Sequence, residues 1–132
     1  MGVYLGRLRP EYPGTDALSL SVAPQALIWL ETADPQLSWV FGEGARLSHP
    51  SFLLALAAKT DLVVGHVVVP PEVAAARRAV RPGKALSEQY CKIAASKAQN
   101  LASWAREAGI PLLELDGSRP VEELAEKIFC NH

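Results

Sequence analysis

The sequence lacks the features that mark secreted, membrane-spanning and nucleic-acid-binding proteins. Cys91 and Cys130 are the only cysteines in 132 residues, and they have neither zinc-site spacing nor the density of a disulfide scaffold. No apolar run approaches the roughly 20 residues of a membrane-spanning helix, and residues 1–8 lack the pattern of a secretory signal. The 13 Lys and Arg against 14 Asp and Glu leave a net charge of -1 and no basic excess for nucleic acid. We expect a cytoplasmic protein with reduced thiols and with neither membrane nor nucleic-acid partners.

Motifs for two common kinds of chemistry are missing as well. There is no G-x-S-x-G nucleophile elbow and no recognisable Cys/His arrangement for covalent hydrolysis. His49 and His66 have no neighbouring His, Cys or carboxylate at metal-ligand spacing, so no metal site is predicted. His66 lies in an apolar stretch, where we expect a buried and hydrogen-bonded side chain. These absences leave small ligands and protein partners as the leading classes.

The residues that are present favour one folded domain. Hydrophobic residues make up 49% of the chain and charged residues 20%, a balance that can bury enough apolar surface to offset chain entropy. The first 20 residues are turn-rich, with one strand candidate at 3–8. Ser48 is the predicted cap of the second helix, and Gly109 is expected to end the fourth. Apolar spacing predicts helices over 22–31, 52–59, 71–81, 90–108 and 121–129, and strands over 37–41, 62–69 and 110–115.

A valine-rich segment decides the predicted architecture. Five of the eight positions 62–69 are Val, without alternation of polar and apolar side chains, which predicts a strand buried on both faces of a parallel sheet. The alternation of strands and helices then predicts a single α/β domain over residues 1–132, a three-layer sandwich with a mostly parallel sheet. This pattern alone does not separate it from a flavodoxin-like or Rossmann-like domain. No G-x-G-x-x-G motif is present to support dinucleotide binding.

Parallel sheets bind ligands beyond the carboxyl ends of their strands, so the residues that follow each predicted strand are candidates. After 37–41, Glu43 and Arg46 lie in a glycine-rich turn. They either bind phosphate or magnesium-bound water, or interact with each other or with solvent. After 62–69 and its helix come Arg77, Arg78 and Arg81. These cations either bind phosphate or stabilise a helix C-terminus, and we weigh the two equally.

Two further segments are candidates. After 110–115, Asp116, Gly117 and Ser118 form a turn before a helix N-terminus, where free amides attract anions. Capping alone explains them, and we favour it over a catalytic role. Near the start, a loop combines polar, aromatic and glycine residues, a mix that often carries specificity but also fits a surface turn.

Together these segments resemble the nucleotide-kinase branch of the P-loop kinases, thymidylate kinase-like proteins especially. The clearest similarity runs from residue 60 through Pro-Pro-Glu-Val-Ala at 70–74 to residue 81, and again over 108–123. The resemblance implies ATP and Mg²⁺ as cofactors. It implies that the transferred phosphate is contacted by Arg77, Arg78 and Arg81. It places beside the adenine Asp116, Gly117, Ser118 and Arg119. It places on the acceptor side Arg9, Thr15, Asp16, Glu43 and Arg46.

One departure from that family outweighs these similarities. Its defining G-x-x-x-x-G-K-[ST] loop is absent from the 132 residues. In the family this loop follows the first strand, which lies in the middle of the sheet, between the strands that match 37–41 and 62–69. We therefore expect a P-loop kinase fold without its first strand and helix, truncated at the N-terminus or naturally without them. Two strand edges would then need new partners.

Two hypotheses follow. The first is a nucleotide or nucleoside kinase-like domain, inactive alone, that acts as a phosphotransferase if a phosphate loop is supplied from elsewhere. Its acceptor would be a nucleotide or another small molecule. The second is a degenerate nucleotide-binding or protein-interaction module that associates through strand edges, as a homo-oligomer or with a partner chain. We favour the first for ancestry and leave activity open.

Overall fold

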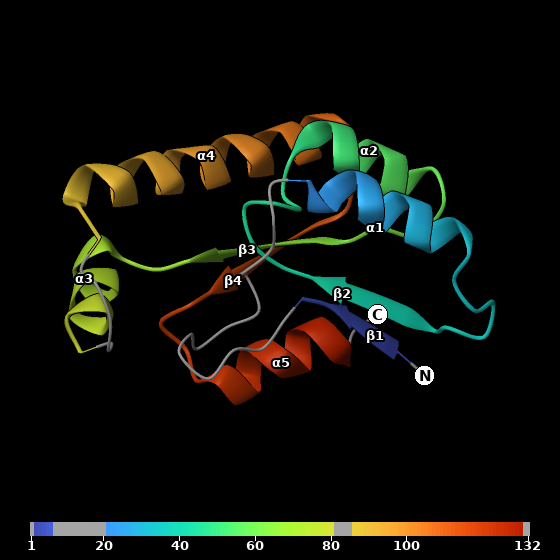
Figure 1. Cartoon of the computed structure of the whole chain (residues 1–132). Helices are drawn as coiled ribbons and strands as arrows, with labels where there is room; N and C mark the ends of the chain where they lie inside the picture. Colours follow the sequence, from blue (N-terminus) through green and yellow to red (C-terminus); the bar gives the residue numbers. More distant parts are fainter. Residues whose placement is uncertain (1, 7–20, 81–85, 131–132) are drawn as a thin grey trace. The chain divides into compact units, whose positions relative to one another are not determined.

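The computed structural model describes residues 2–6, 21–80 and 86–130 (Figure 1). The chain divides into two compact units, Met1–Leu62 and Val63–His132. The first contains β1 (Gly2–Leu5), α1 (Val22–Glu31), β2 (Trp39–Gly42) and α2 (Pro50–Ala57). The second contains β3 (Val64–Val68), α3 (Pro71–Ala79), α4 (Glu88–Glu107), β4 (Leu112–Asp116) and α5 (Val121–Phe129).

The predicted α/β character is confirmed in both units, and the strands pair in parallel. Over the described residues β1 pairs with β2, and β3 pairs with β4, as two sheets of two strands each. Each pair is joined through helices, as parallel neighbours require. A continuous sheet between two helical layers stays a prediction. None of the helices in the described ranges combines the length and apolar character needed to cross a bilayer.

In the first unit, aromatic side chains fix the pairing of β1 with β2. Tyr4 lies opposite Phe41 in the strand register, with ring centroids 4.8 Å apart. Gly2 lies opposite Trp39, and a Cβ at position 2 would overlap the indole ring. With the indole in this position, glycine is the residue that fits at the start of β1.

The two helices of this unit pack on each other, around the buried residues Ala23, Phe52 and Leu53. An ion pair of 2.7 Å between Lys59 Nζ and Glu31 Oε1 joins the last residue of α1 to the segment after α2. Hydrogen bonding and the positive charge of Lys59 lower the pKa of Glu31. Because both side chains are exposed, packing of the apolar residues contributes more to this contact than the charges do.

The cap of α2 is His49, so the prediction of Ser48 was wrong. The amide of Phe52 donates to His49 Nδ1 at 3.4 Å. Pro50 occupies the first helical position and forces the preceding residue into an extended conformation, with φ of -142° and ψ of 153° at His49. The residue before a proline at this position is therefore the one that can cap the helix.

In the second unit, α4 covers β3 and β4 (Figure 1). The buried hydrophobic residues are small or aliphatic and come from the C-terminal half of α4, from β4 and from the segment between them. They are Ala102, Ala105, Ile110 and Leu115. Ser87 caps α4 by accepting the amide of Tyr90 at 3.1 Å, and Gly109 follows its last turn with a φ of +76°, as predicted.

Two expectations about β3 were wrong, the burial of its valines and the hydrogen bond of His66. Val67 and Val68 are 56% and 47% exposed, because β3 has only β4 as a strand partner among the described residues. His66 Nδ1 is buried but has no hydrogen-bond partner in the described part of the chain.

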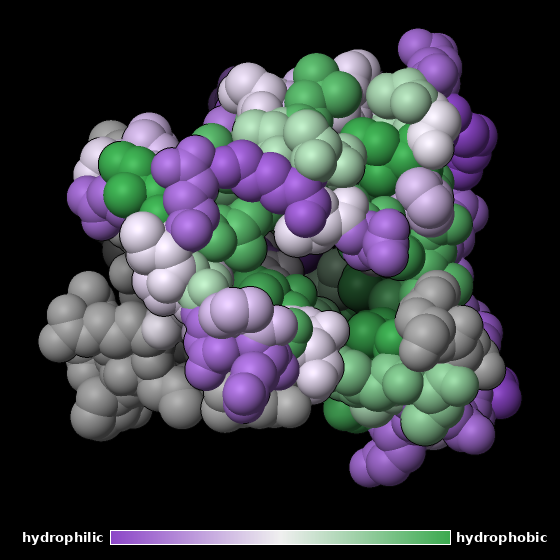
Figure 2. Space-filling model, turned by 90° about the vertical axis from the view of Figure 1, so that its right-hand side faces the viewer, coloured by the Kyte–Doolittle hydropathy of each residue, from purple (hydrophilic) through white to green (hydrophobic). Residues whose placement is uncertain are grey.

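The predicted apolar stripe of α4 is buried only in part. Tyr90 and Ile93, in its first half, are 58% and 48% exposed. A 20-residue helix is about 30 Å long, whereas the five-residue strands that it covers span about 17 Å. The first half of α4 therefore extends past the strands. Hydrophobic side chains elsewhere also reach the surface among hydrophilic ones (Figure 2).

Substituting Gly109 by Ala should lower the free energy of unfolding by about 1 kcal/mol, because alanine is strained at positive φ. The matched control is Gly65→Ala in β3, where an added Cβ would meet Leu115 Cδ1 at an ordinary 3.8 Å. Urea denaturation followed by circular dichroism measures both. Equal losses in the two variants would contradict the assignment of Gly109 as a left-handed helix end.

Candidate functional site

The turn that follows β4 is held tightly against β3. The amide of Gly117 donates to the Val68 carbonyl at 2.8 Å, which extends the parallel pairing one residue past the end of β4. A Cβ at position 117 would lie 2.5 Å from Val69 Cγ1 and 2.7 Å from Val67 Cγ1. Gly117 is therefore required by close approach at the carboxyl ends of both strands, where parallel sheets bind ligands.

The side chain of Asp116 folds back onto this turn. Its Oδ1 accepts the Ser118 hydroxyl at 2.5 Å and the Ser118 amide at 3.0 Å. The hydroxyl first and the amide second lower the pKa of Asp116, since both hydrogen bonds favour the ionised carboxylate. The carboxylate thus holds the turn, whereas the expected cap is not found: α5 begins after Pro120 with no side-chain cap hydrogen bond.

Arg119, which follows Ser118, is held by a residue in the first turn of α5. Its Nε and Nη2 donate to the two carboxylate oxygens of Glu123 at 2.9 and 3.1 Å. This ion pair raises the pKa of Arg119. Two parallel hydrogen bonds hold the planar guanidinium in one orientation, although the residue is exposed. Such a plane can stack on an aromatic ring.

Arg77 joins this turn to α3. Its Nη1 donates to the Gly117 carbonyl at 2.6 Å, in a partly buried bond between residues 40 positions apart. Arg78, the next residue, is half-buried, and its side chain has no hydrogen bond or ion pair with any described residue. The structure therefore brings Arg77 of α3 to the turn 116–119, although the sequence offered these two segments as separate candidates.

The other predicted site residues do not join this cluster in the described structure. Glu43 and Arg46 follow β2 in the first unit, half-buried and exposed respectively. The predictions for Arg9, Thr15, Asp16 and Arg81 lie outside the described residues. Over the described ranges, no group of three or more His, Cys, Asp or Glu could hold a metal ion.

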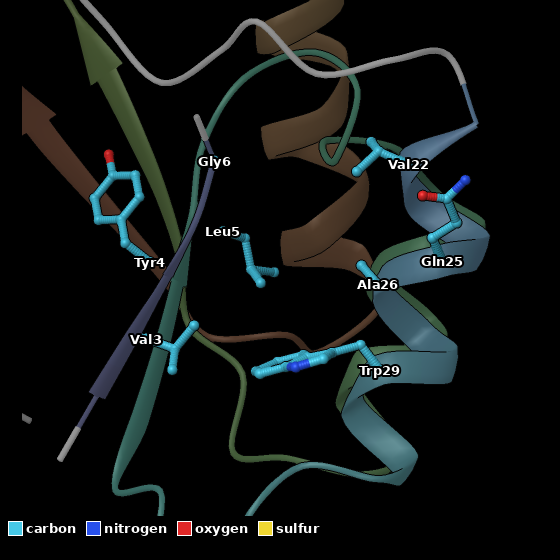
Figure 3. Close-up of a pocket in the computed structure, with 8 residues that line it drawn as sticks. All are labelled: Val3, Tyr4, Leu5, Gly6, Val22, Gln25, Ala26 and Trp29. Atoms are coloured by element: carbon cyan, nitrogen blue, oxygen red, sulfur yellow. The ribbon is translucent and has the colours of Figure 1, made fainter. Parts of the chain in front are cut away.

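A hollow in the first unit was missed by sequence reasoning. It has a volume of about 440 Å³ and lies between β1 and α1 (Figure 3). Leu5 and Trp29 point into it from the two elements, whereas Tyr4 points to the other side of β1. Among its eight lining residues only Gln25 has a side-chain amide. The alternation of side chains along β1 and the helical spacing of 22, 26 and 29 are the signals that could have located it.

A family model described as P-loop Nucleotide Kinase3 matches residues 1–112, out of 132 in the chain. The match includes α3 with Arg77 and Arg78, and it ends at the first residue of β4. No curated protein and no solved structure matches the chain.

Replacing Ser118 by Ala should raise the pKa of Asp116, because the hydroxyl that gives the largest stabilisation of its carboxylate is removed. In the native chain the lowered pKa adds stability above the ordinary carboxyl pKa, and this stability is lost as pH falls through the lowered value. In the variant this contribution of Asp116 to stability should be smaller, and its loss on acidification should be complete at a higher pH.

Carboxyl ¹³C chemical shifts recorded against pH measure the pKa directly. Ser96→Ala, on the exposed surface of α4, is the control. An unchanged pKa of Asp116 in Ser118→Ala would show that the hydroxyl does not stabilise the carboxylate.

Proposed function

Because the chain belongs to the P-loop Nucleotide Kinase3 family, we propose that it binds a nucleotide beside α3 and the turn 116–119. The observation that carries this proposal is the contact between Arg77 and Gly117, which places the last turn of α3, with Arg77 and its neighbour Arg78, beside a turn at the carboxyl ends of β3 and β4. Clustered guanidiniums suit phosphate oxygens, and the ends of parallel strands are where nucleotides bind.

The residues of this cluster fit a nucleotide in two respects. Arg78 is half-buried and has no side-chain partner among the described residues, so its guanidinium is available to bind a phosphate. The guanidinium plane of Arg119, held by Glu123, offers a face for the adenine ring, next to Ser118. By family resemblance Arg81 joins the phosphate side, and the acceptor faces Arg9, Thr15, Asp16, Glu43 and Arg46.

Magnesium is the second cofactor that the family implies. When bound it neutralises phosphate charge, and it is commonly held by one or two carboxylates, water and the phosphates themselves. The described residues contain no multi-carboxylate cage for it. We therefore propose that Mg²⁺ arrives with ATP and is not a resident metal.

Phosphoryl transfer needs more than this cluster. The 132 residues contain no G-x-x-x-x-G-K-[ST] loop whose amides and lysine hold the β- and γ-phosphates. We propose that these residues alone bind nucleotide weakly and do not transfer phosphate, and that a phosphate loop from elsewhere is required for kinase activity. A thymidylate kinase-like acceptor is the specificity that the resemblance favours.

The test is isothermal titration of the chain with ATP. Arg78→Ala should weaken ATP binding about tenfold, since it removes a charge-assisted hydrogen bond worth roughly 1.5–3 kcal/mol. Lys92→Ala removes the same charge from the exposed surface of α4, where Lys92 pairs with Glu88, and should leave affinity unchanged. If the unaltered chain binds neither ATP nor a nucleoside monophosphate, the proposed function is wrong.

A second candidate function is association through strand edges. It is favoured by the valine-rich β3, which has one strand partner among the described residues and carries no Lys, Arg, Asp or Glu. Uncharged edges of this kind readily pair with further strands.

Val68→Lys should shift such an assembly toward monomer, because a charge at an edge opposes strand pairing. Val80→Lys, at an 82% exposed position after α3, is the matched control. Light scattering after size exclusion measures the mass of each. A native chain that is monomeric at all concentrations would remove this alternative.

A further inference from the structure

We infer that Arg77 is a positioning residue that holds the turn 116–119 against α3, and that Arg78 alone of the two contacts phosphate. The part that concerns ligands rests on the proposed function. The part that concerns the turn does not need a ligand.

The carbonyl of Gly117 is held in one direction by the backbone around it. The amide of Gly117 donates to the Val68 carbonyl, which fixes the peptide unit before the glycine. The amide of Ser118, in the same peptide unit as the Gly117 carbonyl, donates to Asp116 Oδ1 at 3.0 Å and fixes the unit after it. The Gly117 carbonyl presents a fixed acceptor, and Arg77 meets it at 2.6 Å. A charged donor makes this a stronger bond than a neutral one would.

Apart from the backbone bond to Val68, the other hydrogen bonds of the turn are local. The Asp116 carboxylate bonds to Ser118, the Arg119 amide to the Asp116 carbonyl, and the Arg119 side chain to Glu123. Among the described residues, Arg77 is the one side chain that bonds to this turn from a distant element. It thus ties the end of α3 to the segment expected beside the adenine.

Arg77 and Arg78 are neighbours on α3 and point in different directions. Successive residues point about 100° apart, since an α-helix has 3.6 residues per turn. When Arg77 faces Gly117, Arg78 cannot face it as well. Arg78 is left without a partner in the described chain, which suits a ligand contact and not a structural one.

Amide hydrogen exchange tests the contact between Arg77 and the Gly117 carbonyl without any ligand. In Arg77→Ala the amides of residues 117–119 should exchange about tenfold faster than in the native chain. Arg77→Lys, which keeps a charged donor, should restore much of the protection. Arg78→Ala and the surface control Lys92→Ala should leave it unchanged. Equal exchange in Arg77→Ala and the native chain, or equal acceleration in Arg77→Ala and Arg78→Ala, would overturn the inference.

Adenosine and ATP then separate the two roles. Arg77→Ala should weaken both ligands by the same factor, because it loosens the base side of the site. Arg78→Ala should weaken ATP about tenfold and leave adenosine unchanged. Loss of ATP affinity alone in Arg77→Ala would make Arg77 a phosphate ligand and overturn the inference.

Two controls distinguish a failure of the proposed function from a failure of the inference about Arg77. If the native chain binds neither adenosine nor ATP, the proposed function fails, and the exchange data alone decide whether the tie exists. Circular dichroism shows whether Arg77→Ala folds. If it does not fold, Arg77→Lys is compared with the native chain instead. A small loss of protection confined to residues 117–119 supports the inference, and a loss throughout the second unit contradicts it.

Discussion

The hydrogen bond from the Gly117 amide to the Val68 carbonyl is the contact on which the candidate site depends. It continues a backbone ladder beyond β4, so the position of the turn is set by strand pairing and not by its charges. The exposed ion pair of Arg119 with Glu123 would contribute little by itself. Anchored by the ladder, the same side chains gain fixed orientations. Backbone geometry thus organises polar groups whose own attractions are weak.

The helices were largely predictable from the sequence, because local signals determine them. The spacing of apolar residues located α1 at its observed bounds, and Gly109 ended α4 where its positive φ is found. The burial of β3 was not predictable in the same way. A run of valines indicates a strand, but exposure of Val67 and Val68 depends on which strands and helices lie beside them. Likewise, Pro50 selects His49 as the cap through a steric effect on its neighbour, which residue preferences for caps do not include.

The candidate site was predictable only in its separate parts. The local pattern of Asp116, Gly117 and Ser118 indicated a turn before a helix, and the hydrogen bonds of that turn agree with it. No local pattern distinguishes Arg77 from Arg78, and the bond that does so crosses 40 positions. Contacts of this length depend on the fold of the whole unit, which brings Arg77 to the turn after β4. They explain why adjacent and chemically identical residues can have different tasks.

The contact between Gly2 and Trp39 has a consequence for how this chain can vary among relatives. The indole occupies the space that any side chain at position 2 would need. A larger residue at position 2 requires either a smaller residue at position 39 or a turn of the exposed indole away from β1. Covariation of the two positions across the family would therefore report this strand register wherever no structure has been determined.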